Sequence, residues 1–323
     1  MCTAISYHTK DHYFGRTLDY EHSYQEAVTV TPRSYPFHFR RLPPMEQHHA
    51  MIGMATVSNG YPLYYDATNE YGLSMAGLNF PHSCVYQSES ADKFNLSPFE
   101  VIPWILGSCK TVAEAKDLLK SANIIDLSFS DEYPVTPMHW YLADHQQALT
   151  VEPTTQGLRI YDNIVEVLTN EPPFPYHMTN LQNYLHLSNE EPVNSFAPSL
   201  PLTPYSRGMG AMGLPGDLSS ASRFVKAAFT KLNSVAKDSE SASISQVFHI
   251  LGSVAQQQGC VKVGNFFEKT IYTSCCNTSK GIYYYTTYEN SQITGVRLHK
   301  EDLDSNTLVS YPLVKGQQIR MEN

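Results

Sequence analysis

The order in which strand-like and helix-like segments alternate is the feature that most constrains the fold of this chain. β-branched and aromatic residues with alternating polarity predict strands in residues 3–31 and 50–80, again in 140–169, and again in 270–298. Helical regions separate these three blocks. Such an order favours two antiparallel sheets packed face to face with helices outside, and it disfavours a βαβ winding.

Capping signals predict the positions of the first two helices. Ser97-Pro-Phe-Glu100 and Thr111-Val-Ala-Glu114 are capping boxes, and they precede predicted helices over residues 101–106 and 115–122. Apolar spacing predicts two further helices. Those two helices are predicted over residues 219–232 and 244–257. The proline-rich stretch over residues 172–204 is expected to be an irregular loop that lies over a surface or a cleft.

The charge balance limits the partners that the chain can have. Lys plus Arg number 22 and Asp plus Glu number 31, so the formal net charge is −9. A negative protein lacks a broad electrostatic attraction to nucleic acid or anionic lipid. We therefore expect neither a nucleic-acid partner nor a membrane partner.

The first residues and the cysteine count indicate a compartment. Lys10 and Asp11 come before any long apolar run, so we expect no signal peptide and no membrane helix. Six cysteines among 323 residues are too few for a disulfide scaffold. The sequence therefore predicts a cytoplasmic protein with reduced thiols.

Cys2 is the strongest candidate for a functional residue. Removal of Met1 would leave a thiol and a free α-amine on one residue, and the amine can accept the proton of the thiol near neutral pH. A Met-Cys start is weak evidence by itself, because a cysteine can stand second without being reactive. The evidence has to come from the residues around it.

Five separated motifs supply that evidence. They resemble the choloylglycine hydrolase family of N-terminal-nucleophile hydrolases, and most closely its bile salt hydrolases from gut bacteria; the resemblance extends from residue 1 to about residue 300. The motifs are Met1-Cys-Thr-Ala, Gly15-Arg-Thr-Leu-Asp-Tyr20, Asn69-Glu-Tyr-Gly-Leu-Ser-Met-Ala-Gly-Leu-Asn-Phe80, Leu168-Thr-Asn170 and Gly213-Leu-Pro-Gly-Asp-Leu-Ser-Ser-Ala-Ser-Arg223.

This resemblance implies a fold and an activity. The fold is α+β, a four-layer αββα sandwich of two antiparallel sheets between helix layers, formed by residues 1–323 as a single N-terminal-nucleophile hydrolase domain. The activity is hydrolysis of the amide that joins glycine or taurine to a bile acid, without a cofactor or a metal. Relatives in the family are commonly homotetramers, so a homotetramer is expected here as well.

The resemblance also implies roles for six residues. An arginine near a thiol favours the thiolate, a carboxylate holds the amine, and amide N–H groups stabilise the oxyanion of the tetrahedral intermediate. The alternatives are a solvated Arg–Asp pair and asparagines that merely form turns. The predicted roles are Cys2 as nucleophile, Arg16 and Arg223 beside its sulfur, Asp19 at the α-amine, and Asn79 and Asn170 in the oxyanion hole.

Aromatic side chains could form the apolar wall that a steroid needs. Many of them fall in presumed loops near the site, although core packing is the ordinary role of any one of them. The predicted substrate-binding residues are Tyr20, Tyr24, Tyr65 and Phe129, with Tyr61 and Tyr64 as further candidates.

Other functions remain open from the sequence. A penicillin V acylase of the same family shares the nucleophile, but Asn79 favours bile salts because those acylases tend to carry tyrosine there. A catalytically silent binder of amphipathic ligands is a second alternative, and a papain-like peptidase a third, although Cys109 and Cys260 lack its setting at a helix start. Glu171 departs from the family pattern, in which a second asparagine follows Asn170, and it would place a negative charge near the substrate.

Two short patterns have less specific interpretations. Gly208-Met-Gly-Ala-Met-Gly213 matches a dinucleotide-binding pattern without the βαβ context, so we expect a flexible loop bordering the active site. The adjacent Cys275 and Cys276 are expected to be buried small hydrophobic residues. The histidines show no zinc-ligand spacing.

Overall fold

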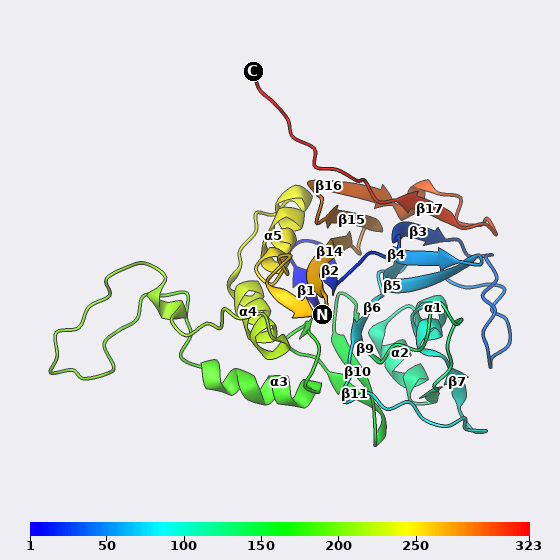
Figure 1. Ribbon diagram of the computed structural model, residues 1–323, viewed down its shortest axis with the longest axis horizontal. Helices are drawn as coiled ribbons and strands as arrows, with labels where there is room; N and C mark the ends of the chain where they lie inside the picture. The colour runs from blue at the N-terminus through cyan, green and yellow to red at the C-terminus, as the bar shows by residue number, and fades with distance from the viewer.

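The first two strands form a hairpin within the first sheet. β1 (Cys2–His8) pairs with β2 (His12–Tyr20), and nearly every residue of both strands is buried. The computed structural model describes residues 1–323 and shows this sheet beside a second one (Figure 1). The strand order of the first sheet is β12 (Val167–Leu168), β1, β2, β14 (Phe266–Asn277), β15 (Ile282–Thr287) and β16 (Asn290–Arg297), and β13 (Val261–Val263) pairs with β14.

The second sheet is also antiparallel throughout. Its residues alternate between a face toward the first sheet and a face toward helices, as the side-chain period of two requires. A separate parallel pair joins β7 (Phe94–Leu96) and β8 (Ala122–Ile124). The strand order of the second sheet is β11 (Gly157–Asp162), β10 (Ala148–Thr154), β9 (Met138–Ala143), β6 (Ser74–Asn79), β5 (Tyr61–Asn69), β4 (Met51–Ser58), β3 (Ala27–Thr31) and β17 (Val309–Pro312).

Helices cover the outer face of each sheet. α4 (Ser220–Asn233) and α5 (Glu240–Gly252) contact strands of the first sheet, and α3 (Phe174–Leu181) packs on α4. On the other side, α1 (Val101–Ser108) contacts β5 and β6, and α2 (Val112–Leu119) contacts β10. No helix is both long enough and apolar enough to cross a membrane. The predicted four-layer αββα sandwich is therefore confirmed.

Two apolar cores hold the layers together. The first includes inward side chains of both sheets, such as the stacked rings of Phe14 and Tyr141 at 5.5 Å, together with the faces of α4 and α5. The second lies between the second sheet and α1 and α2, around Trp140 and Trp104. Because the first core joins both sheets, β1 and the residues around Cys2 lie in the interior of the molecule.

The prediction of an irregular stretch over residues 172–204 is partly wrong, because α3 forms within it. Pro173 and Pro175 stand at the cap and in the first turn, where a missing N–H costs nothing. Phe174 and His177, three residues apart, are both buried. A short amphipathic face thus outweighs the low helix propensity of the prolines.

Other boundaries differ where tertiary contacts decide them. α5 starts at Glu240 rather than residue 244, because Ser239 accepts a capping hydrogen bond from the Ala242 N–H, and it ends at Gly252 rather than residue 257. The sequence prediction missed β7, β8, β13 and β17. These strands have only three or four residues each, too few to show a clear alternation.

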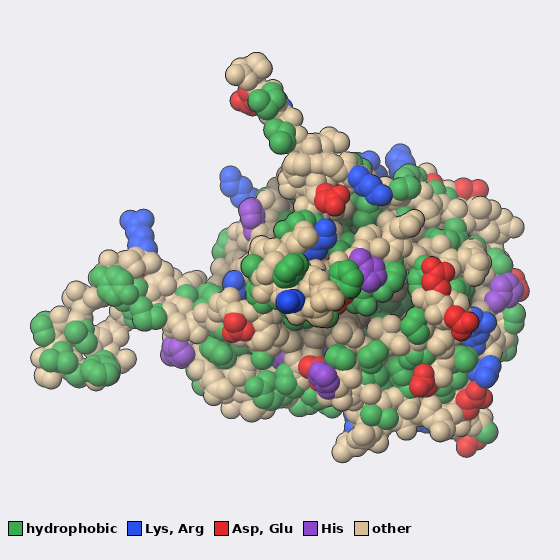
Figure 2. Space-filling model, viewed as in Figure 1, with side chains coloured by type: hydrophobic (Ala, Val, Ile, Leu, Met, Phe, Trp, Pro, Cys, Tyr) green, Lys and Arg blue, Asp and Glu red, His purple; other side chains and the backbone are tan.

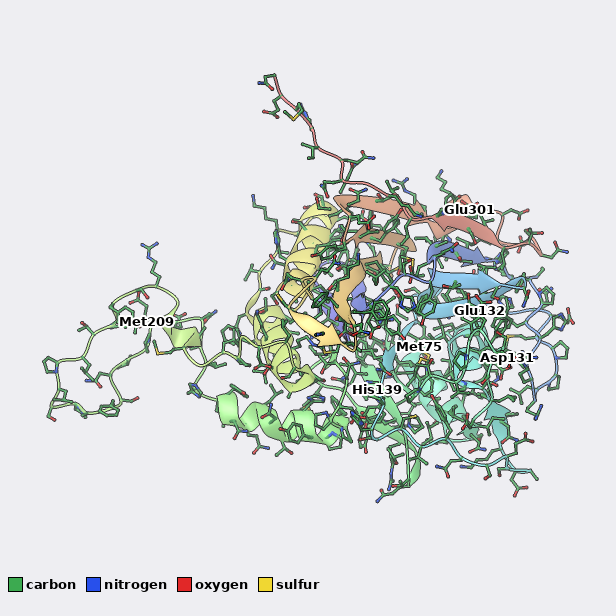
Figure 3. All side chains as sticks on the ribbon, viewed as in Figure 1. Met75, Asp131, Glu132, His139, Met209 and Glu301 are labelled. Atoms are coloured by element: carbon green, nitrogen blue, oxygen red, sulfur yellow. The ribbon has the colours of Figure 1, made fainter.

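The chain between α3 and α4 does not lie over the body of the molecule. Figure 1 shows it as an arm that projects away from the sheets. Met209 lies on this arm, far from the centre (Figure 3). The expectation of a loop over a surface or a cleft, and of a glycine-rich loop bordering the active site, is therefore wrong. A short 3-10 turn, Met209–Ala211, occupies the glycine-rich motif.

Candidate active site

Cys2 and Arg16 meet at the beginning of the β1–β2 hairpin. Arg16 lies two residues before Leu18, which pairs with Cys2, so both side chains point to the same face of the sheet. Arg16 Nη2 donates a hydrogen bond to Cys2 Sγ at 2.8 Å. Its other N–H groups donate to three backbone carbonyls, those of Thr17, Tyr65 and Gly77, at 3.0 to 3.1 Å. The side chain is fully buried.

The buried guanidinium of Arg16 keeps its positive charge. Burial alone would lower its pKa, but Tyr272, Cys2 and Asp66 raise the pKa above the ordinary value. Asp66 is buried between the sheets and accepts hydrogen bonds from Tyr272 and Tyr283 at 2.6 and 2.7 Å; burial raises the pKa of Asp66. The sulfur of Cys2 therefore lies 2.8 Å from a buried cation.

Arg223 and Asn170 contact Cys2 from the other side. Arg223, in α4, donates from Nη1 to the Cys2 carbonyl at 2.5 Å and from Nη2 to Asn170 Oδ1 at 2.7 Å. The Cys2 backbone N–H donates to the same Oδ1 at 2.8 Å. Burial lowers the pKa of Arg223, although Asp19 and Cys2 favour its charged form. Arg223 therefore contacts the backbone of Cys2 rather than its sulfur, which only Arg16 reaches.

Asp19 is fixed beside the N-terminus. Its two carboxylate oxygens accept hydrogen bonds from Thr270 Oγ1 at 2.6 Å and from Thr17 Oγ1 at 3.1 Å. The amine of Met1 donates to the Asp19 carbonyl at 2.7 Å and also contacts Glu268. Cys2 N is a peptide nitrogen while Met1 is present, and it stands for the α-amine of a chain that has lost Met1.

Asn79 and Asn170 are brought together by two strand ends. Asn79 ends β6, Asn170 follows β12, and Asn170 Nδ2 donates to the Asn79 carbonyl at 2.7 Å. The side-chain amide of Asn79 makes no hydrogen bond within the chain, so its N–H groups are available to a ligand. All six predicted catalytic residues thus belong to one contiguous cluster.

The four predicted substrate-binding residues also lie near one another. The rings of Tyr20 and Tyr24 are 5.5 Å apart, and Thr56 Oγ1 hydrogen-bonds with the Tyr65 hydroxyl at 2.8 Å. Phe129 reaches this group through Tyr133, whose ring lies 6.2 Å from Phe129 and 6.3 Å from Tyr24. The sequence prediction missed Tyr133, which has no pattern to mark it.

Two details of the sequence prediction are wrong. Tyr20 and Tyr65 lie in strands rather than loops. Tyr61 and Tyr64 are buried on the far side of the second sheet, in the second core. With Met1 present, Cys2 is only 4% exposed.

Glu171 has a local structural role that its charge alone did not indicate. Its Oε1 accepts hydrogen bonds from the backbone N–H groups of His82 and Ser83 at 2.8 and 2.7 Å, and its Oε2 accepts one from Ser83 Oγ at 2.8 Å. The carboxylate therefore connects the loop after Asn79 to the segment containing Asn170, rather than presenting a free charge to a substrate.

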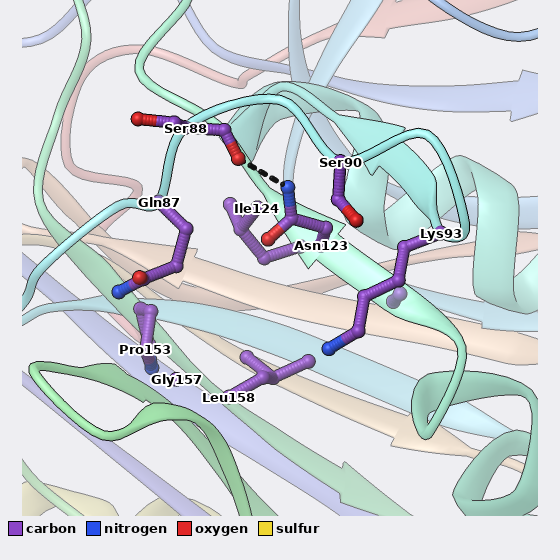
Figure 4. A pocket seen from close by; sticks show the side chains of 10 residues that line it. Gln87, Ser88, Ser90, Lys93, Asn123, Ile124, Pro153, Gly157 and Leu158 are labelled. Carbon is purple, nitrogen blue, oxygen red and sulfur yellow. Dashed lines mark hydrogen bonds between the residues drawn. The ribbon is translucent and has the colours of Figure 1, made fainter.

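Other candidate sites carry less chemistry. No group of three His, Cys, Asp or Glu side chains is arranged to hold a metal ion. Cys275 and Cys276 are buried thiols in β14, and burial raises the pKa of each, so they pack as predicted. A mostly polar surface groove, which contains no predicted site residue, is lined by Gln87, Ser88, Ser90, Lys93, Ala122, Asn123, Ile124, Pro153, Gly157 and Leu158 (Figure 4).

The fold and the position of the cysteine define a class. Two antiparallel sheets between helix layers, with a cysteine at the start of a buried strand, are typical of N-terminal-nucleophile hydrolases. Residues 2–311 match the model of the linear amide C–N hydrolases, choloylglycine hydrolase family. The chain belongs to this family.

Individual relatives agree with that assignment. The chain is 54% identical over 314 residues to a bile salt hydrolase/transferase of Lactiplantibacillus plantarum, which covers 97% of each chain. A crystal structure of a mutant conjugated bile acid hydrolase from Clostridium perfringens matches with a TM-score of 0.93 and 36% identity over 100% of both chains. A penicillin V acylase from Agrobacterium tumefaciens, at TM-score 0.76 and 18% identity over 97% of this chain and 92% of the other, shares the fold.

Proposed function

We propose that this protein hydrolyses the amide bond of glycine- or taurine-conjugated bile salts, with Cys2 as an N-terminal nucleophile after Met1 is removed. The products are a free bile acid and glycine or taurine. The observation that carries the proposal is the contact between Cys2 Sγ and the buried Arg16 at 2.8 Å, with Asn170 on the other side of Cys2. The relatives named for bile salts support the choice of substrate.

The chemistry proceeds in two steps. The Cys2 thiolate attacks the amide carbonyl, and the oxyanion of the tetrahedral intermediate accepts hydrogen bonds from Asn79 and Asn170. The C–N bond then breaks, and the leaving amine takes a proton from the α-ammonium of Cys2. A thioester remains, and water activated by the same amine hydrolyses it.

The environment of the N-terminus suits this use of the amine. Burial lowers the pKa of the Met1 amine, and Asp19 opposes that effect. Once Met1 is removed, the amine of Cys2 takes a position beside Asn170 Oδ1 and the Arg223 guanidinium. The oxygen of Asn170 favours the protonated amine, and the positive charge of Arg223 favours the neutral amine. An amine balanced in this way can accept a proton and return it near neutral pH.

The test compares three substrates with one assay. Purified protein is incubated with glycocholate, taurocholate and penicillin V, and the released amines are quantified; Cys2→Ser is the control. We expect release of glycine or taurine well above that of the penicillin product, and none from the variant. Preferential cleavage of penicillin V would assign the acylase alternative, and no cleavage of any substrate would indicate a silent binder.

We also propose that the protein is a homotetramer and that residues 1–323 act as one catalytic domain. The projecting arm supports an assembly, because hydrophobic side chains gather on it (Figure 2) and a lone chain would leave them in water. They include Val193, Phe196, Leu202 and Tyr205, each at least half exposed. Sedimentation of the full chain, with Phe196→Ser as the comparison, tests the assembly.

A cytoplasmic location is the last part of this proposal. All six cysteines are free thiols, although Cys275 and Cys276 are adjacent in one strand. Free thiols are typical of a reducing compartment. Fractionation of the producing cells, followed by the bile-salt assay, tests the location.

A further inference from the structure

The segment that carries Asn170 is held at three backbone polar groups. The Thr169 carbonyl accepts a hydrogen bond from His139 Nε2 at 2.9 Å, and the Asn170 N–H donates to Ser220 Oγ at 2.8 Å. These two groups belong to one planar peptide unit, which is thereby fixed at both ends. The Asn170 carbonyl accepts a further hydrogen bond from His177 Nε2 at 3.0 Å. Together these contacts set the direction of the Asn170 side chain.

His139 is the central residue of this support. It lies in β9, is fully buried, and lies within the body of the molecule (Figure 3). Its Nδ1 faces Glu152 Oε1 at 3.1 Å, and the same oxygen accepts the Phe174 N–H at 3.0 Å. Both ring nitrogens therefore face oxygen atoms. The Thr169 carbonyl can only accept a hydrogen bond, so His139 Nε2 is the donor in that contact, and Glu152 fixes the opposite edge of the ring.

The same imidazole also supports the second asparagine. The ring of His139 stacks on Phe80 at 4.3 Å with an interplanar angle of 7°, and Phe80 directly follows Asn79. In the strand register, His139 stands opposite Leu78. One buried side chain therefore contacts both segments that carry the asparagines of the site.

Resting on the function proposed above, we propose that His139, held by Glu152, is a positioning residue for amide hydrolysis. It fixes the peptide between Thr169 and Asn170 and so aims the Asn170 amide at the oxyanion, without touching the substrate. Neither residue belongs to the motifs that mark the family resemblance. Their effect is on the transition state, because the oxyanion exists only there.

The first test is Glu152→Gln. The amide oxygen can still accept the Phe174 N–H, but a neutral group replaces the carboxylate that faces His139 Nδ1. Because a misplacement of about 1 Å can cost on the order of 10²-fold in rate, we expect kcat with glycocholate to fall by about tenfold or more while KM stays unchanged. The rate is expressed per folded protein, with the folded fraction measured by circular dichroism and urea denaturation, so that any misfolded fraction does not count.

A second variant and a double variant separate positioning from folding. His139→Asn removes the donor to Thr169, and if both residues act through one contact, the double variant loses no more activity than the worse single variant. The control is Glu166→Gln, which removes a carboxylate that also pairs with a histidine, His8 at 2.9 Å, and in addition with Lys231 at 2.6 Å; Glu166 directly precedes β12, at the end away from Asn170. We expect its kcat to be unchanged.

The outcomes are distinguishable. A wild-type protein that releases no glycine overturns the proposed function and this inference with it. An active wild type together with an unchanged kcat per folded protein in Glu152→Gln overturns the inference alone. A rise in KM without a fall in kcat overturns it as well, since it would place the effect on substrate binding.

Discussion

The substitution Asn170→Asp separates the catalytic role of Asn170 from its structural role. An aspartate is nearly isosteric and keeps an oxygen for the Cys2 nitrogen and for Arg223 Nη2, which now contact Oδ1 at 2.8 and 2.7 Å. It loses the Nδ2 donor that contacts the Asn79 carbonyl at 2.7 Å in the resting site. Loss of one oxyanion donor typically lowers kcat by about 10²–10³, so we expect a loss of that size with glycocholate.

The cost in stability should be smaller than the cost in activity. The only group that loses its partner is the Asn79 carbonyl, which corresponds to about 1–3 kcal/mol in the free energy of unfolding, and the new charge beside Arg223 offsets part of it. Asn170→Ala is the comparison, because it leaves three buried partners without a contact and should unfold more easily. Urea denaturation and glycine release measure the two effects. A folded Asn170→Asp protein with nearly normal kcat would refute the assignment of Asn170 to the oxyanion hole.

Three further predictions follow from the site and its surroundings. A residue retained ahead of Cys2 should leave the protein folded but lower turnover by about 10²–10⁴-fold, because the amine of Cys2 is then an amide. Intact mass and an activity assay check this. Iodoacetamide should label the exposed Cys260 as well as Cys2, yet it should inactivate the Cys260→Ser variant as fast as the wild type. Peptide mapping compared with residual activity measures both. Burial lowers the pKa of His177 to about 4 and of His12 to about 3, so below pH 6.5 the unfolded chain binds protons that the folded chain does not. The Tm should therefore fall as the pH falls from 6.5 toward 4, and it should fall less steeply in His177→Phe.

The sequence predicted best what depends on local patterns. The strands β1 and β2 follow from their β-branched and aromatic residues, and the register of their pairing brings Cys2 and Arg16 to one face. Asn170 and Arg223 could be named only through the family resemblance, since nothing local connects them to Cys2. Thr270, which fixes Asp19 from 251 residues away, gave no signal at all.

The buried histidines show why the remainder of the site was not predictable. A single histidine in an apolar strand has no pattern that distinguishes a positioning residue from a packed one. The partner of His139 is Glu152, in the neighbouring strand β10, and its hydrogen-bond acceptor is a backbone carbonyl, which carries no sequence identity. Such contacts follow from the arrangement of strands β9, β10 and β12, and so they appear only once the fold is complete.

The two arginines together indicate the kind of reaction for which the site is built. Arg16 and Arg223 are both fully buried, and neither has a carboxylate within ion-pair distance; their N–H groups contact carbonyls, hydroxyl and amide oxygens, and the Cys2 sulfur. Burying two cations without a direct counter-ion is costly, and the cost falls when a negative charge forms between them. The thiolate and the oxyanion of the tetrahedral intermediate are such charges. The two cations stabilise these anionic species more than they stabilise the neutral thiol and the neutral substrate. The site therefore favours the charged states that form during an acyl transfer to Cys2.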